Sequence, residues 1–246
     1  MKKILRLSWC MLCILFVTFS ISGFKKIKNN AVDNTLTDKE KKEGWQLLFN
    51  GQDLTNWKVY QNATSSSWVV QDGMLCSTKP VGNNPDLLSI NMYENFELSA
   101  DWKLSPEGNS GILYHVTEDH PNTYQSGPEY QLIDDDGFPE KIENYQKTGA
   151  NYAMNAPSVR AIKPPNEWNH TVIIVNKAHV EHWLNGQKVV EYELWSDAWQ
   201  QAKNAGKWKD EAGYGAAKKG YIAFQASHSH VENTGVCFKN IKIKIL

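Results

Sequence analysis

The residues of this chain that could catalyse a reaction or bind its substrate lie in short segments in which polar and apolar residues alternate. Three of them have ionisable side chains (Lys103, His115 and Glu129) and two have amide side chains (Gln131 and Gln225). Glu129 and Gln131 share one face of their segment, because successive side chains of a strand point to opposite sides. If these segments are neighbouring strands, we expect the five side chains to converge on one groove. The alternative is that they form the solvated faces of half-buried strands.

Glu129 is the strongest candidate for a catalytic carboxylate. It directly follows a glycine–proline turn signal, which places it at the start of a strand. We predict catalytic roles for Glu129 and Lys103, and a substrate-binding role for His115. Gln131 and Gln225 are predicted to bind hydroxyl groups, since amides form hydrogen bonds but do not transfer protons at neutral pH. The groove would therefore recognise a ligand rich in hydroxyl groups.

Histidines and clustered carboxylates are the candidates for a metal site. His228 and His230 would share a face if their segment is extended, so a two-histidine metal site is one interpretation and a flexible polar loop is the other. The acidic run 134–136 could offer oxygen ligands to Ca²⁺. The rest of an EF-hand loop is missing, however, and a solvated turn is the better interpretation. We therefore predict no metal ligand, while Ca²⁺ or another divalent cation stays open as a cofactor.

Several other classes of site are excluded because their patterns are missing from the sequence. The segment 108–112 is not a nucleophile elbow, because its second glycine directly follows the serine. The chain has neither the His-Glu-x-x-His pattern of a zinc helix nor a phosphate-binding glycine-rich loop. Its 26 Lys and Arg residues balance 27 Asp and Glu residues, which argues against nucleic acid as a partner.

The elements that would position these residues are short β-strands. In the segment 96–104 every second residue is apolar, which is the period of a half-buried strand. Similar runs occupy residues 68–75, 111–116, 129–133, 170–175, 179–184, 187–194, 220–225 and 236–245. Asn185-Gly186 separates two of them and is a strong hairpin signal. The good helix candidate spans residues 196–203, with Ser196 as its cap. The pattern predicts an all-β sandwich with a short helical insertion.

The first 43 residues differ in composition from the rest of the chain. Residues 1–22 have a basic start, an apolar run and small residues, which is the pattern of a secretory signal, and we expect cleavage after Ser22. The apolar run is shorter than the about 20 residues that span a membrane. A retained anchor is therefore the less favoured alternative, and no stable membrane insertion is expected after cleavage. Residues 23–43 would form a polar tether or a short helix, and residues 44–246 a single domain in the periplasm or outside the cell.

The cysteines Cys76 and Cys237 would remain after removal of the signal. An oxidising compartment permits a disulfide between them. A large sandwich does not need one, however, and we predict that both are buried free thiols.

Tryptophan is abundant in this chain, with ten residues among 246. Trp199 lies in the helix candidate, and we expect it to pack on the sandwich. Trp208 lies in a lysine-rich stretch after that helix, where an aromatic ring could stack on the face of a sugar. We therefore include Trp208 among the predicted substrate-binding residues.

Short motifs follow one another through the predicted domain. They are Gly44–Gly51, Leu54–Trp57, Trp68–Leu75, Asn109–Ile112, Gly127–Leu132, Glu167–Asn169, Asn185-Gly186, Gly220–Gln225 and Phe238–Ile241. Each is weak alone, but in this order they make the chain resemble the 3-keto-disaccharide hydrolase family from Gly44 to Leu246. The resemblance implies a jelly-roll β-sandwich of the concanavalin A-like type. It also implies cleavage of glycosides whose sugar carries a ketone at C3.

One motif departs from the pattern of that family. The family has Gln-x-His-Gly shortly before its last strand, whereas the corresponding stretch of this chain, Gln225–Gly235, is longer. Its histidine is displaced by one residue and is followed by a second one. Either His228 or His230 can therefore take the family position.

The chemistry that the resemblance implies needs an acid–base site. A ketone at C3 acidifies the hydrogen on C2, a base removes it, the enolate expels the group at C1, and water then adds across the new double bond. We predict Glu129 or His228 as the base, with Lys103 or a bound cation beside the developing oxyanion. Asn109 and Gln131 would orient hydroxyl groups of the substrate.

Two other functions compete with this interpretation. A non-catalytic carbohydrate-binding sandwich would have amides and aromatic rings in its groove without an acid–base pair. A conventional glycosidase needs two carboxylates across the scissile bond, and the alternating acidic run of jelly-roll glucanases is missing from this chain. A carbohydrate is the expected partner in each case. The sequence predicts neither the oligomeric state nor the linkage that is cleaved.

Overall fold

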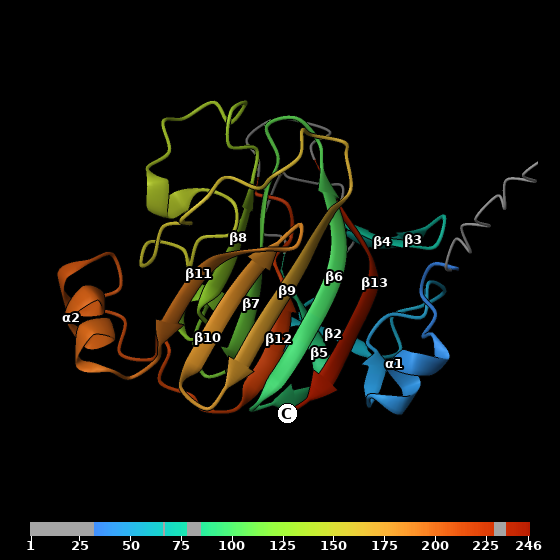
Figure 1. Ribbon diagram of the computed structural model, residues 1–246, viewed down its shortest axis with the longest axis horizontal. Helices are drawn as coiled ribbons and strands as arrows, with labels where there is room; N and C mark the ends of the chain where they lie inside the picture. The colour runs from blue at the N-terminus through green and yellow to red at the C-terminus, as the bar shows by residue number, and fades with distance from the viewer. Residues whose placement is uncertain (1–31, 66, 78–84, 229–234) are drawn as a thin grey trace, which may run out of the picture. The chain divides into compact units, whose positions relative to one another are not determined.

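Two antiparallel β-sheets packed face to face form the body of the protein (Figure 1). The computed structural model describes residues 32–65, 67–77, 85–228 and 235–246. The predicted signal, residues 1–22, and the first part of the predicted tether lie outside the described residues. Among the described residues, the helices are too short or too polar to cross a membrane.

The larger sheet has eight strands. They are β1 (Trp45–Leu47), β3 (Trp68–Gln71), β4 (Met74–Ser77), β6 (Phe96–Leu104), β9 (Asn169–Asn176), β10 (His179–Leu184), β11 (Gln187–Glu193) and β13 (Val236–Ile245). Their order is β11-β10-β9-β6-β13-β4-β3, and β1 pairs with β13. The chain thus returns at its end to the middle of this sheet, where β13 lies between strands from the first half of the sequence.

The smaller sheet has five strands. They are β2 (Trp57–Val59), β5 (Leu87–Tyr93), β7 (Asn109–Val116), β8 (Glu129–Ile133) and β12 (Gly220–Phe224). Their order is β2-β5-β12-β7-β8. The strand β7 is therefore flanked by β8, which follows it in the chain, and by β12, which begins about 90 residues after the end of β8. In Figure 1 this sheet lies behind β6, β9 and β10.

The core between the sheets follows the period-two pattern of the sequence. On β6 the residues Phe96, Leu98, Ala100, Trp102 and Leu104 are all buried. Phe224 of β12 stacks on Phe238 of β13, with ring centroids 4.4 Å apart, and so joins the two sheets. Each such buried aromatic side chain contributes about 1.5–3 kcal/mol to folding. The jelly-roll sandwich predicted from the sequence is confirmed.

The predicted hairpin and helix are both present. Asn185 and Gly186 have φ values of 50° and 82° and connect β10 to β11, as a two-residue hairpin turn requires. The helix α2 (Asp197–Ala205) begins after Ser196, whose side chain accepts a hydrogen bond from the backbone of Trp199. Trp199 is buried, as expected. Within the described residues, the connections contain three short 3₁₀ helices, η1 (Tyr60–Asn62), η2 (Thr123–Gln125) and η3 (Asn144–Gln146).

The described part of the predicted tether packs on the larger sheet. It contains the helix α1 (Asp38–Lys42), which Thr37 caps. The side chain of Asn34 donates a hydrogen bond of 2.8 Å to Gly73, and its backbone N–H donates to Asn240. Glu40 forms an ion pair with Lys242 of β13. From residue 32 onward this segment is therefore part of the folded unit, and the short-helix interpretation describes it better than a tether.

Cys76 and Cys237 form a disulfide, so the prediction of free thiols was wrong. The two residues lie directly opposite each other in the β4–β13 pair, with a Cα–Cα distance of 4.1 Å. They are 161 residues apart in the sequence. Strand register therefore decides this pairing, and spacing along the chain carries no signal of it.

Candidate active site

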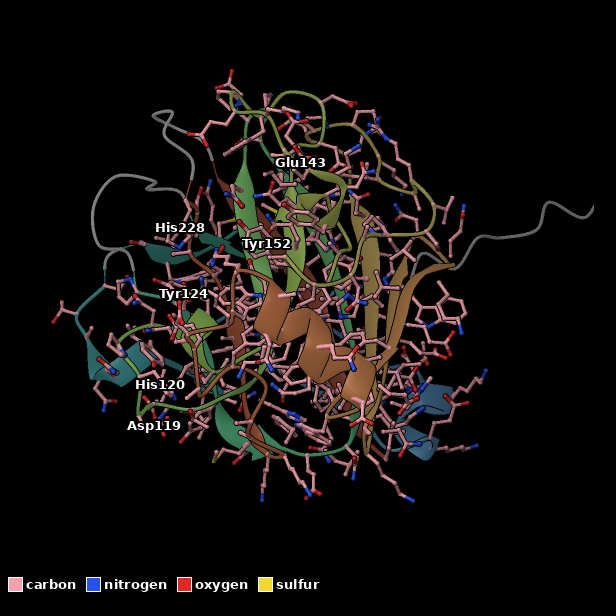
Figure 2. The ribbon with its side chains drawn as sticks, turned by 90° about the vertical axis from the view of Figure 1, so that its left-hand side faces the viewer. Asp119, His120, Tyr124, Glu143, Tyr152 and His228 are labelled. Carbon is pink, nitrogen blue, oxygen red and sulfur yellow. A yellow bond between two sulfur atoms is a disulfide. The ribbon has the colours of Figure 1, made fainter. Side chains whose placement is uncertain are left out.

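The smaller sheet carries a pocket of about 190 Å³ on the face that points away from the larger sheet. Its floor consists of strand residues and one residue next to a strand: Asn109, Glu129, Gln131 and Gln225. Its walls come from connecting segments: Tyr124, Tyr152, Lys207, Trp208 and His228. Figure 2 shows Tyr124, Tyr152 and His228 gathered in one region of the molecule. The strands β7 and β8 and the residue that follows β12 therefore supply the floor, and connecting segments supply the walls.

Strand alternation places the polar floor residues. Tyr130 and Leu132 of β8 point into the core, so Glu129 and Gln131 point to the opposite face. Gly111 on the neighbouring strand β7 makes room for the carboxyl of Glu129. A Cβ atom at position 111 would lie 2.9 Å from Cγ and Cδ of Glu129, and nearer still to Oε1. The glycine is thus required because the glutamate side chain lies across its strand.

Burial sets the protonation state of Glu129. The side chain is 5% exposed, and desolvation raises the pKa of its carboxyl to about 8, with a further rise from Asp86 and an opposing effect from Lys207. A carboxyl with this pKa is mostly protonated at neutral pH. In this form Glu129 can donate a proton, as a general acid does.

Lys207 brings a positive charge to the pocket. Its Nζ lies 4.5 Å from the ring centroid of Tyr152 and 4.7 Å from that of Trp208, with Tyr124 at 6.0 Å. Such contacts attract a cation to the faces of the rings. Trp208 is itself buried, stacks on Tyr214 at 4.4 Å and donates a hydrogen bond to the carbonyl of Tyr152. Packing thus fixes the ring of Trp208, and the ammonium group of Lys207 lies over it at the pocket.

The amide side chains on the floor can bind hydroxyl groups. Gln131 is 3% exposed, and its Oε1 has no hydrogen-bond partner among the described residues. A buried acceptor without a partner costs about 1–3 kcal/mol, and a hydroxyl group of a ligand could satisfy it. Gln225 is also buried, and Asn109 is half-buried beside it.

His228 lies at the rim of the pocket. Its side chain is exposed, and its backbone N–H donates a hydrogen bond of 2.9 Å to the carbonyl of Asn109. His230, the other candidate for the histidine position, lies outside the described residues. The structure thus places His228 beside Glu129 and Lys207 as a third ionisable group of the pocket.

Lys103 and His115 do not line this pocket. Lys103 lies on β6 of the larger sheet, where its Nζ is 5.1 Å from the ring centroid of Trp168. Alternation indicates which face of a strand a residue occupies but not which sheet the strand joins. His115 is buried on β7 with a φ of 55°, and its Nε2 donates to the carbonyl of Glu94. The positive φ breaks the regular alternation at this position and directs the ring away from the pocket.

Three pocket residues were missed in the sequence: Tyr124, Tyr152 and Lys207. All lie in connecting segments, where the alternation of a strand does not indicate which way a side chain points. Lys207 lies in the lysine-rich stretch after the predicted helix. In that stretch the neighbouring Trp208 was the residue that indicated a binding site. The sequence therefore predicted six of the nine lining residues. Five were predicted from the motifs of strands or from the stretch that follows the strand 220–225, and Trp208 was predicted because its aromatic ring could stack on a sugar.

The carboxylates of the acidic run 134–136 have partners within the protein. Asp134 accepts hydrogen bonds from the backbone N–H groups of Glu107 and Gly137. Asp135 accepts one from Thr148, and Asp136 forms an ion pair with Arg160. These contacts fit a turn held by internal hydrogen bonds, and the burial of Asp134 makes it less solvated than the sequence favoured.

The comparisons with known proteins agree with this fold and extend to the pocket. The sequence profile of the 3-keto-alpha-glucoside-1,2-lyase-like domain matches residues 44–244. A protein of Bacteroides thetaiotaomicron named 3-keto-disaccharide hydrolase is 30% identical over 234 residues, which cover 83% of this chain and 79% of that protein.

Two crystal structures from Parabacteroides distasonis, both of candidate glycosyl hydrolases, have the same architecture. One is 41% identical, with a TM-score of 0.81, and the match covers 87% of this chain and 100% of the other. The second is 28% identical, with a TM-score of 0.64, and covers 82% and 99%. The residues matched by the domain profile include all nine that line the pocket. The chain therefore belongs to the family of 3-keto-alpha-glucoside-1,2-lyase-like domains.

Proposed function

We propose that this protein is a hydrolase or lyase that cleaves the glycosidic bond of sugars whose C3 hydroxyl has been oxidised to a ketone. Membership of the family supports this substrate class. The observation that carries the proposal is Glu129, a buried carboxyl with a pKa of about 8 that shares one small pocket with Lys207 and His228. A groove that only bound carbohydrate would not need these three groups together.

The pocket residues match the steps of an elimination. His228 takes the proton from C2, which the neighbouring ketone has made acidic, and the electron pair passes into the C2–C3 bond as an enolate. Lys207 stabilises the negative charge on the C3 oxygen. The enolate then collapses, the bond from C1 to the leaving oxygen breaks, and Glu129 gives that oxygen its proton. Addition of water to the new C1–C2 double bond, with hydroxide at C1 and a proton at C2, completes the hydrolysis.

The remaining floor residues orient the sugar. Gln131, Gln225 and Asn109 face the pocket with amide groups that can bind hydroxyls as donors or acceptors. The ring of Trp208 forms an apolar wall against which one face of a sugar can lie. Together they would hold the C2–H bond toward the base.

The test measures cleavage of a 3-keto disaccharide and includes two matched variants of lysines that both lie over aromatic rings. The purified protein is incubated with a 3-keto disaccharide and with its unoxidised parent, with and without a chelator, and release of the leaving sugar is followed. We expect cleavage of the keto sugar alone. Lys207→Met should lower kcat/KM about 100-fold, whereas Lys103→Met, on the other sheet, should leave it unchanged.

The possible outcomes separate the competing functions. Binding of either sugar without cleavage would favour a carbohydrate-binding module and would overturn the proposal. Cleavage of the unoxidised parent would indicate a conventional glycosidase. Sensitivity to the chelator would indicate that a cation shares the role proposed for Lys207.

We propose further that the protein is exported. The basic and apolar start of the sequence supports a secretory signal. The Cys76–Cys237 disulfide also supports it, because disulfides persist mainly in oxidising compartments such as the periplasm.

A further inference from the structure

A second buried carboxyl, Asp86, lies next to the pocket without lining it. Asp86 precedes β5 and is 7% exposed. Its Oδ1 accepts a hydrogen bond of 3.0 Å from the backbone N–H of Ala226, and its Oδ2 accepts one from the hydroxyl of Thr123. Both oxygens therefore act as acceptors, as those of an ionised carboxylate do.

The contact with Ala226 belongs to a series that fixes the segment 225–228. Four successive backbone N–H groups each donate a hydrogen bond: Gln225 to Gly111, Ala226 to Asp86, Ser227 to Ser77 and His228 to Asn109. Three of the acceptors are neutral carbonyl or hydroxyl oxygens. Asp86 is the acidic residue among them, and it holds the segment between two pocket residues, Gln225 and His228.

The contact with Thr123 reaches a second segment that lines the pocket. Thr123 is the first residue of η2, and its carbonyl accepts hydrogen bonds from the backbone N–H groups of Ser126 and Gly127. The next residue, Tyr124, forms part of the pocket wall. One carboxylate thus joins two segments that carry pocket side chains and that are about 100 residues apart in the sequence.

Asp86 also acts on the ionisable groups around it. Burial raises its own pKa, and the hydrogen bond from Thr123, the charge of His228 and the hydrogen bond from Ala226 oppose this rise. In turn the charge of Asp86 raises the pKa of Glu129 and of Tyr60. Glu129 also faces Lys207 and Tyr214. The negative charge of Asp86 therefore favours the protonated form of Glu129.

We propose that Asp86 is a positioning residue that fixes His228 and Tyr124 at the pocket through the two hydrogen bonds that its carboxylate accepts. The inference rests on the proposed function for the identity of the reaction. The link between Asp86 and His228 does not depend on the substrate.

The kinetic test compares Asp86→Asn with Ser77→Ala. The asparagine keeps the shape of the side chain but removes its charge and one acceptor, whereas Ser77→Ala removes the acceptor for the next amide of the same segment without a change in charge. For Asp86→Asn we expect kcat on a 3-keto disaccharide to fall 10- to 100-fold, with KM changed less than threefold. Ser77→Ala should change kcat less than threefold.

The pH profile distinguishes positioning from simple loss of structure. In Asp86→Asn the basic limb of the kcat/KM profile should move to lower pH, because Asp86 no longer raises the pKa of Glu129. If Asp86→Asn and Ser77→Ala lose equal activity with unchanged profiles, Asp86 is only a structural residue. In a His228→Gln background, Asp86→Asn should cause little further loss.

A measurement without substrate keeps the inference testable if the proposed function fails. The carboxyl carbon of Asp86 is titrated by NMR in the wild-type protein and in His228→Gln. We expect the pKa of Asp86 to be higher in the variant, because the histidine charge that opposes its rise is lost. An unchanged titration would overturn the coupling whatever the activity. This titration also takes the place of the kinetic comparison if Asp86→Asn does not fold.

Discussion

At the scale of single residues, the protonation of Glu129 links the stability of the domain to its chemistry. Its carboxyl has an ordinary pKa of 4.5 when exposed and a pKa of about 8 in the fold, because burial disfavours the charged form. Between these two values the folded state binds a proton that the unfolded state releases. The site is therefore formed at a cost in stability that grows with pH.

This titration predicts the direction of the pH dependence of stability. The contribution of Glu129 to the free energy of unfolding is fully present below pH 4.5 and is lost as the pH rises toward 8. The wild-type protein should lose on the order of 1 kcal/mol per pH unit in this window relative to Glu129→Gln, which cannot titrate. Urea unfolding of both proteins at pH 5, 6 and 7 measures the difference. A difference that is constant with pH would show that the carboxyl is solvated.

Gly111 is the residue that lets the Glu129 side chain occupy its position. Gly111→Ala would place a Cβ atom 2.9 Å from Cγ and Cδ of Glu129, so the carboxyl must move. We expect activity on a 3-keto disaccharide to fall at least about tenfold while the fold, followed by circular dichroism, is kept. The double variant with Glu129→Gln should be no worse than Glu129→Gln alone. Full activity in Gly111→Ala would place the proton donor elsewhere.

At the scale of elements, β4 and β13 are joined by a covalent bond as well as by their ladder. The disulfide closes a loop of 161 residues, which greatly restricts the unfolded chain. Cys76→Ala together with Cys237→Ala should therefore lower the free energy of unfolding by about 2–5 kcal/mol. Urea unfolding with and without a thiol reductant measures this effect.

The reductant also provides the control for the disulfide. It should destabilise the wild-type protein by a similar amount and leave the double variant unaffected. Equal stability of the wild-type protein with and without reductant, after complete reduction has been verified by thiol labelling, would contradict the prediction. The pocket lies on the other sheet, so the rate constants on a 3-keto disaccharide should change little below the unfolding transition.

At the scale of the whole molecule, the proposed export predicts the first residue of the mature protein. When the full chain is expressed in a Gram-negative host, we expect the periplasmic fraction to contain a protein that begins at Gly23, which intact-mass spectrometry identifies. Leu15→Arg interrupts the apolar run and should leave the full-length chain in the cytoplasm. A full-length chain in the membrane fraction would instead indicate a retained anchor.

The fold was largely predictable from the sequence, because its strands are short and regular. The alternation in 96–104 and 129–133 predicted the buried and the polar faces of β6 and β8. Asn185-Gly186 predicted its turn, since both residues tolerate a positive φ. These features depend on neighbouring residues only, and so the sequence by itself determined them.

The sequence also determined which chemical groups the floor of the site could offer. Glu129, Gln131 and Gln225 were identified from their strand faces, and the structure places them in one pocket. The resemblance to the family, which the matched profile confirms, suggested the substrate class. The buried carboxyl of the pocket was therefore identified in the sequence, but as a candidate base, and its preference for the protonated form was not predicted.

The tertiary structure decided which residues meet. It placed Lys103 on the outer side of the other sheet and brought Lys207 to the pocket from a loop about 80 residues from Glu129. It also paired Cys76 with Cys237 and set Asp86 against Ala226. These contacts depend on sheet assignment and strand register, which bring together segments far apart in the chain. The raised pKa of Glu129 has the same origin, because burial is a property of the packed sheets and loops around a residue.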